Sequence, residues 1–142
     1  MSAPVQIKDG SGSGADAKVT SLGQLVTAPY AYDSVVAKTS TVDDTAVNFY
    51  LPKAGEQFVI TGILLTADST VVGSAVITVY EADSATETTV SKTILLIDLL
   101  KNRDRDITGL NILVTAGKFV NLKADDSDVS AVITGYYVPE IS

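Results

Sequence analysis

The chain has 142 residues, a formal net charge of −7 and a sequence pI of about 4.3. A chain of this length fits one domain with its own core, since a domain of about 150 residues buries roughly 70% of its unfolded surface. The sequence has no cysteine and no histidine, which removes disulfides, thiolate metal sites and the commonest general base. We therefore expect that the protein is not an enzyme and that it has no catalytic residue, metal or cofactor.

The acidic balance also argues against nucleic acid and anionic membrane surfaces as partners. No apolar run approaches the roughly 20 residues of a transmembrane helix. The first ten residues lack the basic and apolar regions of a secretory signal. We expect a soluble protein that stays in the compartment where it is made.

Residues 1–29 predict an extended N-terminal arm in front of a domain that spans residues 30–142. The arm carries β-forming residues at both ends and glycines between them, with too little apolar surface for a core of its own. These residues are Val5, Ile7, Val19 and Leu25, and Gly10, Gly12 and Gly14. Two interpretations stay open: a flexible terminal extension, or an arm that becomes ordered by adding strands to the sheet edge of a neighbour.

Residues 30–142 predict an all-β domain, because valine and threonine are abundant and β-branched residues fit a pleated surface better than a helix. Gly62 lies inside one of the predicted strands and is a candidate for a β-bulge or for a point of close backbone approach. The strands expected from alternation and turn signals cover residues 46–52, 56–68, 74–82, 110–114, 118–124 and 129–139. Short strands at this spacing favour a sandwich or barrel of seven or eight strands.

The segment from Val90 to Ile107 is compatible with a helix of about 12 residues or with a strand. Its apolar residues are consecutive and form no stripe at helical spacing, which favours the strand. A strand that is apolar on both faces predicts a homo-oligomer, with one face on the core and the other on a second subunit. The candidate interface residues on this strand are Leu95, Ile97 and Leu99.

Two further groups are candidates for the same interface. Arg103 and Arg105 alternate with aspartates, and they are either ordinary charges of an edge strand or charges that set the register between subunits. Tyr136 and Tyr137 are adjacent in a predicted strand, so one faces the core and the other is exposed or interfacial. We assign Tyr136 to the interface.

Two motifs that suggest ligand sites are better explained by local structure. Residues 10–14 alternate glycine and serine but lack the Gly-Lys-Ser/Thr ending of a phosphate loop. Asp125, Asp126 and Asp128 could hold a calcium ion through carboxylate oxygens. A turn in which Asp and Ser bond their own backbone explains them better.

Several stretches together resemble a known group of proteins. The arm sequence VQIKDGSGSGADAKV followed by GQLVT resembles a segment found on virion structural proteins of tailed bacteriophages. YLPKAGEQFVITGILLTAD, AVITVYEADSATETTVSKTILLIDL, GLNILVTAGKFVNLKADD and ITGYYVP extend the resemblance over nearly the whole chain. The group that these stretches resemble is the head decoration, or cement, proteins of such phages.

This resemblance implies a jelly-roll-like two-sheet β-sandwich that assembles as a homotrimer. It implies binding to the major capsid protein and a place on the capsid surface of the virion, after synthesis in the cytoplasm of the bacterial host. The alternative is a tail-fibre or receptor-binding module that uses the same kind of sandwich to hold host glycans.

Overall fold

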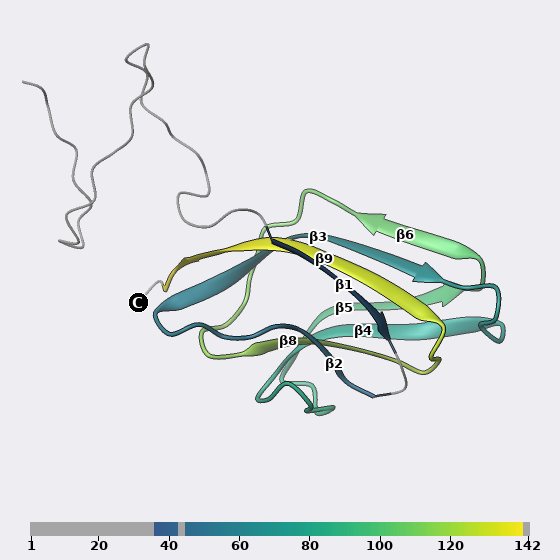
Figure 1. The fold of residues 1–142 in the computed structure, drawn as a ribbon, viewed down its shortest axis with the longest axis horizontal. Coiled ribbons are helices and arrows are strands. Elements are labelled where there is room, and N and C mark those ends of the chain that lie inside the picture. Colours follow the sequence, from purple (N-terminus) through teal and green to yellow (C-terminus); the bar gives the residue numbers. More distant parts are fainter. Residues whose placement is uncertain (1–35, 43–44, 141–142) are drawn as a thin grey trace, which may run out of the picture. The chain divides into compact units, whose positions relative to one another are not determined.

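The computed structural model describes residues 36–42 and 45–140, and all regular structure in these ranges is β-strand (Figure 1). Nine strands lie in the described ranges: β1 (Val36–Val42), β2 (Val47–Tyr50), β3 (Glu56–Ala67), β4 (Ser74–Ala82), β5 (Lys92–Leu100), β6 (Arg103–Ile107), β7 (Ile112–Leu113), β8 (Phe119–Ala124) and β9 (Val129–Pro139). The predicted all-β class is confirmed. Within these ranges no helix is long and apolar enough to cross a membrane.

The strands form two antiparallel sheets, and the strand order is that of a jelly roll. One sheet has the order β1-β9-β3-β6, and the other has the order β2-β8-β4-β5. The short β7 pairs with β3 at Val59–Ile60, directly beyond the part of β3 that pairs with β6. If β6 and β7 are counted as one interrupted strand, each of the two sheets has four strands. This confirms the predicted two-sheet sandwich of jelly-roll type.

The core lies between the two sheets and is built by the alternation of β3, β4, β8 and β9. Its largest fully buried aliphatic side chains include Ile60, Ile63, Leu65, Ile77, Leu122 and Ile133. β3 changes register against β9 between Ile60 and Gly62, so the bulge predicted at Gly62 is confirmed. Because a bulge shifts the pleat by one residue, Ile60 and Ile63 both point into the core.

Two expectations about strands need correction or refinement. The polar stretch of residues 37–44 was not among the expected strands, yet residues 36–42 form β1 and pair with β9 along their whole length. Threonines at alternate positions of this stretch are β-branched and compatible with a sheet edge. The segment of residues 90–107 is resolved in favour of strands, because it contains β5, a tight turn and β6.

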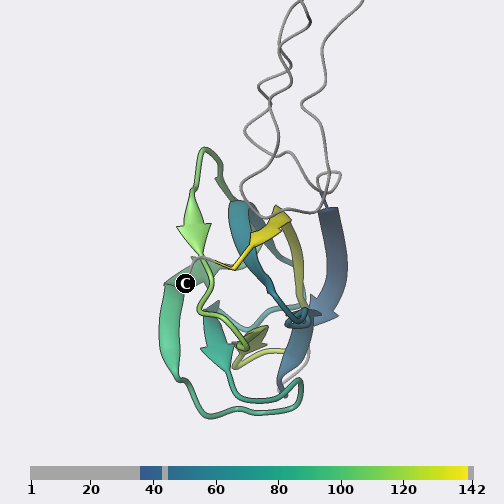
Figure 2. The same cartoon turned by 90° about the vertical axis from the view of Figure 1, so that its left-hand side faces the viewer.

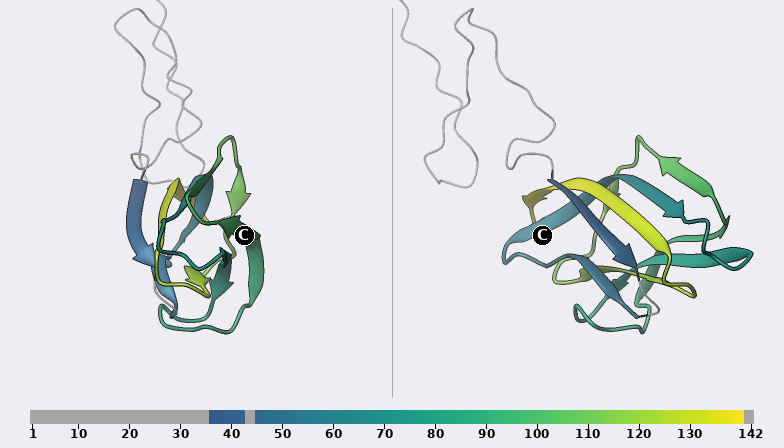
Figure 3. Two further views of the ribbon diagram at one scale, coloured as in Figure 1. Left: turned by 90° about the vertical axis from the view of Figure 1, so that its right-hand side faces the viewer. Right: turned by 45° about the vertical axis from the view of Figure 1, so that its right-hand side comes forward.

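The sandwich has two open sides and two ends, which Figures 2 and 3 show from opposite directions. β5 and β6 lie along one side, and β1 and β2 (blue) lie along the other. We call the first of these the β5–β6 side. Strand pairing gathers the connections at residues 52–55, 83–91 and 115–118 at one end, which we call the loop end.

Candidate functional site

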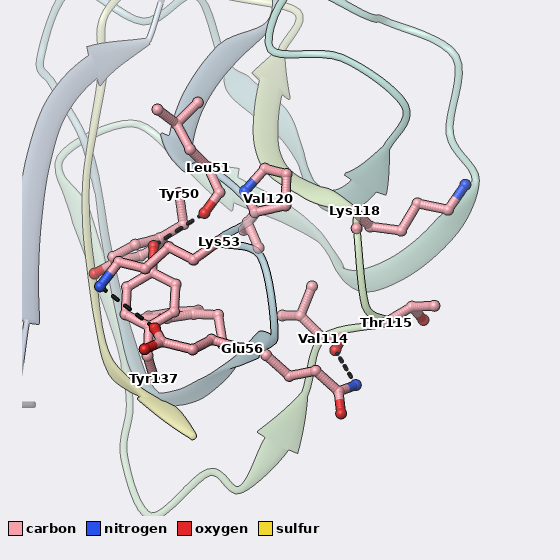
Figure 4. Close-up of a pocket in the computed structure, with 13 residues that line it drawn as sticks. Tyr50, Leu51, Lys53, Glu56, Val114, Thr115, Lys118, Val120 and Tyr137 are labelled. Atoms are coloured by element: carbon pink, nitrogen blue, oxygen red, sulfur yellow. Dashed lines mark hydrogen bonds and ion pairs between the residues drawn. The ribbon is translucent and has the colours of Figure 1, made fainter. Parts of the chain in front are cut away.

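The loop end contains a small pocket whose walls are aromatic rings (Figure 4). The rings of Tyr50 and Phe58 stack with centroids 3.7 Å apart, and Tyr137 meets Phe58 edge-to-face at 5.1 Å. The ammonium of Lys53 lies 3.7 Å from the centroid of the Tyr137 ring. The enclosed space is about 10 Å³, which is room for one water molecule and not for a substrate.

The polar groups of this pocket hold the ends of strands together. The Tyr50 hydroxyl donates to the carbonyl of Ile133, and the Tyr137 hydroxyl donates to the carbonyl of Leu51 at 3.0 Å. Burial, and the nearby Tyr137, raise the pKa of Tyr50 well above its usual value, so this phenol stays protonated as a donor. The tyrosines of the pocket therefore orient and pack the ends of the strands.

The loop of residues 83–91 folds back over the outer face of β4 and β8 and is fixed there by side chains of the sheet. Three donors reach loop carbonyl oxygens: Asn121 Nδ2 to Ser84 (2.9 Å) and Glu87 (3.2 Å), the Tyr80 hydroxyl to Glu87 (2.7 Å), and Lys123 Nζ to Thr88 (2.9 Å). Asn121 and Tyr80 are fully buried under the loop. Burial also raises the pKa of Tyr80.

A buried carboxylate joins the base of this loop to the neighbouring turn. Glu81 is only 2% exposed; its Oε1 accepts hydrogen bonds from Lys92 Nζ at 3.2 Å and from the backbone N–H of Thr115 at 3.0 Å. Asp83 of the loop forms an ion pair with Lys118, which lies on the same turn as Thr115. These contacts thus join the loop of residues 83–91, the turn of residues 115–118 and the sheet into one ordered polar surface.

Sequence reasoning did not identify Asn121 or Glu81. Asn121 interrupts the apolar segment FVNLKA, between the buried Val120 and Leu122. That alternation predicts an outward and solvated side chain, and nothing in the local sequence shows that a distant loop covers it. A polar residue in the middle of an apolar strand was the one available signal.

The candidate interface residues of β5 lie on the inner face of the strand. Leu99 is 6% exposed and belongs to the core, while Leu95 and Ile97 are half-buried and pack against it. β5 is an edge strand, and its alternate residues face the opposite sheet of the same chain. That sheet therefore covers the face of β5 that we had assigned to a second subunit. The exposed leucines of β5 are Leu96 (63%) and Leu100 (61%).

The two arginines lie close to this strand, and Tyr136 does not. Arg105 and Arg103 of β6 stand opposite the buried Leu65 and Ala67 of β3, so both project along the β5–β6 side, where they are exposed. Tyr136 is half-buried on β9, in the middle of its sheet. Tyr137 is buried in the core, which confirms that the two tyrosines face opposite ways.

The remaining candidate residues lie outside the described ranges. They are the arm residues Val5, Ile7, Gly10, Gly12, Gly14, Val19 and Leu25. The arm of residues 1–29 therefore stays a prediction from the sequence.

The acidic turn of residues 125–128 uses its carboxylates for backbone hydrogen bonds. Asp125 Oδ1 accepts from the N–H of Val76 at 2.7 Å, and Asp126 accepts from the N–H groups of Asp128 (3.0 Å) and Val72 (3.4 Å). In residues 36–42 and 45–140 no group of three His, Cys, Asp or Glu side chains is arranged to hold a metal ion. These aspartates cap a turn, as the simpler interpretation predicted.

No known protein family matches the sequence, and no curated protein is similar to it. The chain is also similar to several solved structures, of which three are described here. The first is a protein of the Bacillus endospore appendages, described as disulfide-linked pili (14% identity, TM-score 0.47, 76% of this chain and 87% of that one). The second is the Drosophila NLP core, studied for pentamer formation and histone binding (19% identity, TM-score 0.45, 75% of this chain and 99% of that one).

The third is a chain of the cyanophage Pam1 capsid asymmetric unit (21% identity, TM-score 0.38, 85% of this chain and 98% of that one). Two of the three similar chains thus come from a pilus and a capsid. With TM-scores below 0.5 and identities below 25%, none of the three carries an argument about the activity of this chain.

Proposed function

We propose that this protein is a structural component of a phage virion, a capsid decoration protein that trimerises and binds the major-capsid lattice to stabilise the head. The proposal rests on the sequence resemblance together with one structural observation. The sandwich exposes Leu96 and Leu100 on an edge strand. Such a surface is suited to association. We accordingly propose that the protein is not an enzyme.

The decisive experiment locates the protein on purified particles. A decoration protein should be present in numbers comparable to those of the major capsid protein, and antibody labelling should mark the head. Particles that lack it should lose their contents at a lower temperature, and added full-length protein should restore the wild-type midpoint. Labelling confined to the tail, at a few copies per particle, would refute the proposal.

One observation favours the alternative of a receptor-binding module. The loop of residues 83–91 is held rigidly by the sheet and exposes the hydroxyl-bearing residues Thr86, Thr88 and Thr89. A preorganised polar loop lowers the ordering cost of binding a polar ligand such as a glycan. Labelling of the tail, combined with retention of the protein on host glycans, would favour this alternative.

A further inference from the structure

In the part of the chain that the structure describes, β5 differs from the edge strands β2 and β6. Proteins usually protect a sheet edge with charges, irregularities or short strands. β6 carries four charged residues, and β2 has only four residues. β5 has nine residues, and its outward positions hold Leu96 and Leu100 on either side of one charge, Asp98. The half-exposed Val76 of β4 lies opposite Asp98 and widens the apolar surface.

The two strands of the β5–β6 side carry charges of both signs. Arg103 and Arg105 are the only two arginines of an acidic chain, and both lie on β6, the strand that forms one border of the β5–β6 side. Within residues 36–42 and 45–140, neither arginine nor Asp98 forms an ion pair. Arginine is the cation enriched in protein interfaces, where its planar group pairs with carboxylates in a fixed geometry.

We propose that the β5–β6 side is the surface through which copies of this chain associate. Leu96 and Leu100 of one copy become buried against the adjoining copy, and Arg103 and Arg105 pair with Asp98 of that copy. We infer that the partner at this surface is a second copy of the chain, because the β5–β6 side carries apolar residues together with both members of a charge pair. In a closed ring every copy supplies both halves of the contact, so each copy has to carry both members of the charge pair. The inference deepens the proposed function and rests on its claim of an oligomer.

The first test uses the full-length protein and leucine variants in sedimentation velocity. Leu96→Asp and Leu100→Asp place a carboxylate in the proposed contact, and each should raise the dissociation constant of the oligomer by at least about tenfold. Leu51→Asp is the matched control, since Leu51 is 57% exposed at the loop end and should leave assembly unchanged. Circular dichroism checks that each variant is folded. If an aspartate variant does not fold, Leu96→Thr takes its place. Threonine keeps the β-propensity of the position and removes most of the apolar surface.

The second test reverses the charges. The double variant Arg103→Asp/Arg105→Asp should weaken assembly, and adding Asp98→Arg to it should restore most of the loss at low salt. Unchanged assembly of the leucine variants, a monomeric full-length protein at micromolar concentration, or failure of the charge reversal to restore assembly would each overturn the inference. These measurements use the isolated protein, so their outcome does not depend on where the protein lies on the virion.

Discussion

Among the glycines of the described ranges, Gly135 is the one with the least room for a side chain. A methyl group at this position would lie 2.1 Å from the carbonyl oxygen of Val59 and 2.3 Å from the ring of Phe58. The ring stacks on Tyr50, and the carbonyl belongs to the neighbouring strand β3. Neither can move without disturbing the aromatic cluster of the loop end.

We predict that Gly135→Ala lowers the free energy of unfolding by about 3 kcal/mol or more, at the upper end of overpacking effects. Gly109→Ala is the control, because Gly109 has φ of +69° and no atom within 4 Å of the added methyl group. It should cost only the roughly 1–2 kcal/mol of a left-handed conformation. Urea unfolding of both variants measures the difference. Equal losses would show that the strand shifts to make room for the methyl group.

At the scale of single residues, the sequence could predict what depends on alternation within one strand. The opposite orientation of Tyr136 and Tyr137 follows from the pleat alone, and the bulge at Gly62 follows from a glycine inside an apolar strand. The burial of Asn121 depends on a loop more than 30 residues away along the chain. No local pattern contains that information.

At the scale of elements, the type of β5 was predictable and its orientation was not. Consecutive apolar residues argue against an amphipathic helix, and the structure confirms a strand. Which leucines point outward depends on how the strand pairs with β4 and on which sheet it joins. The inward set is Leu95, Ile97 and Leu99, because they pair with or neighbour the buried residues of β4. The sequence of β5 alone is apolar on both faces and offers no choice between them.

The loop of residues 83–91 is an element without regular structure whose order depends on one buried amide. We predict that Asn121→Ala destabilises the protein by about 1–3 kcal/mol, because the Ser84 carbonyl loses the hydrogen bond from Asn121 and the Glu87 carbonyl keeps only the one from Tyr80. Amide hydrogen exchange in residues 83–91 should accelerate more than exchange in β3. Asn111→Ala, at an exposed asparagine, should stay within about 0.5 kcal/mol of wild type. Unchanged exchange in the loop would mean that Tyr80 and Lys123 are sufficient to hold it.

At the scale of the whole molecule, the sandwich contains its own core. All core residues in the described ranges lie between Phe49 and Tyr137. We therefore predict that removing residues 1–22 leaves the β-type circular dichroism spectrum and a cooperative unfolding transition. On particles that lack the protein, the truncated form should reach a lower occupancy than the full-length form. Equal occupancy and equal thermal stability of the two kinds of particle would contradict a role of the arm in attachment.

The position of β9 has a consequence for how the chain reaches its native state. The last strand lies between β1 and β3, and it pairs Val36 with Gly135 and Glu56 with Pro139. The central pairings of this sheet therefore have to wait until the ribosome has released the chain as far as Pro139. Closing such long loops is slow, and topologies dominated by distant pairings fold in milliseconds to seconds. Meanwhile β3 has an uncovered edge, so newly made copies are most prone to aggregate in this interval, before assembly can begin.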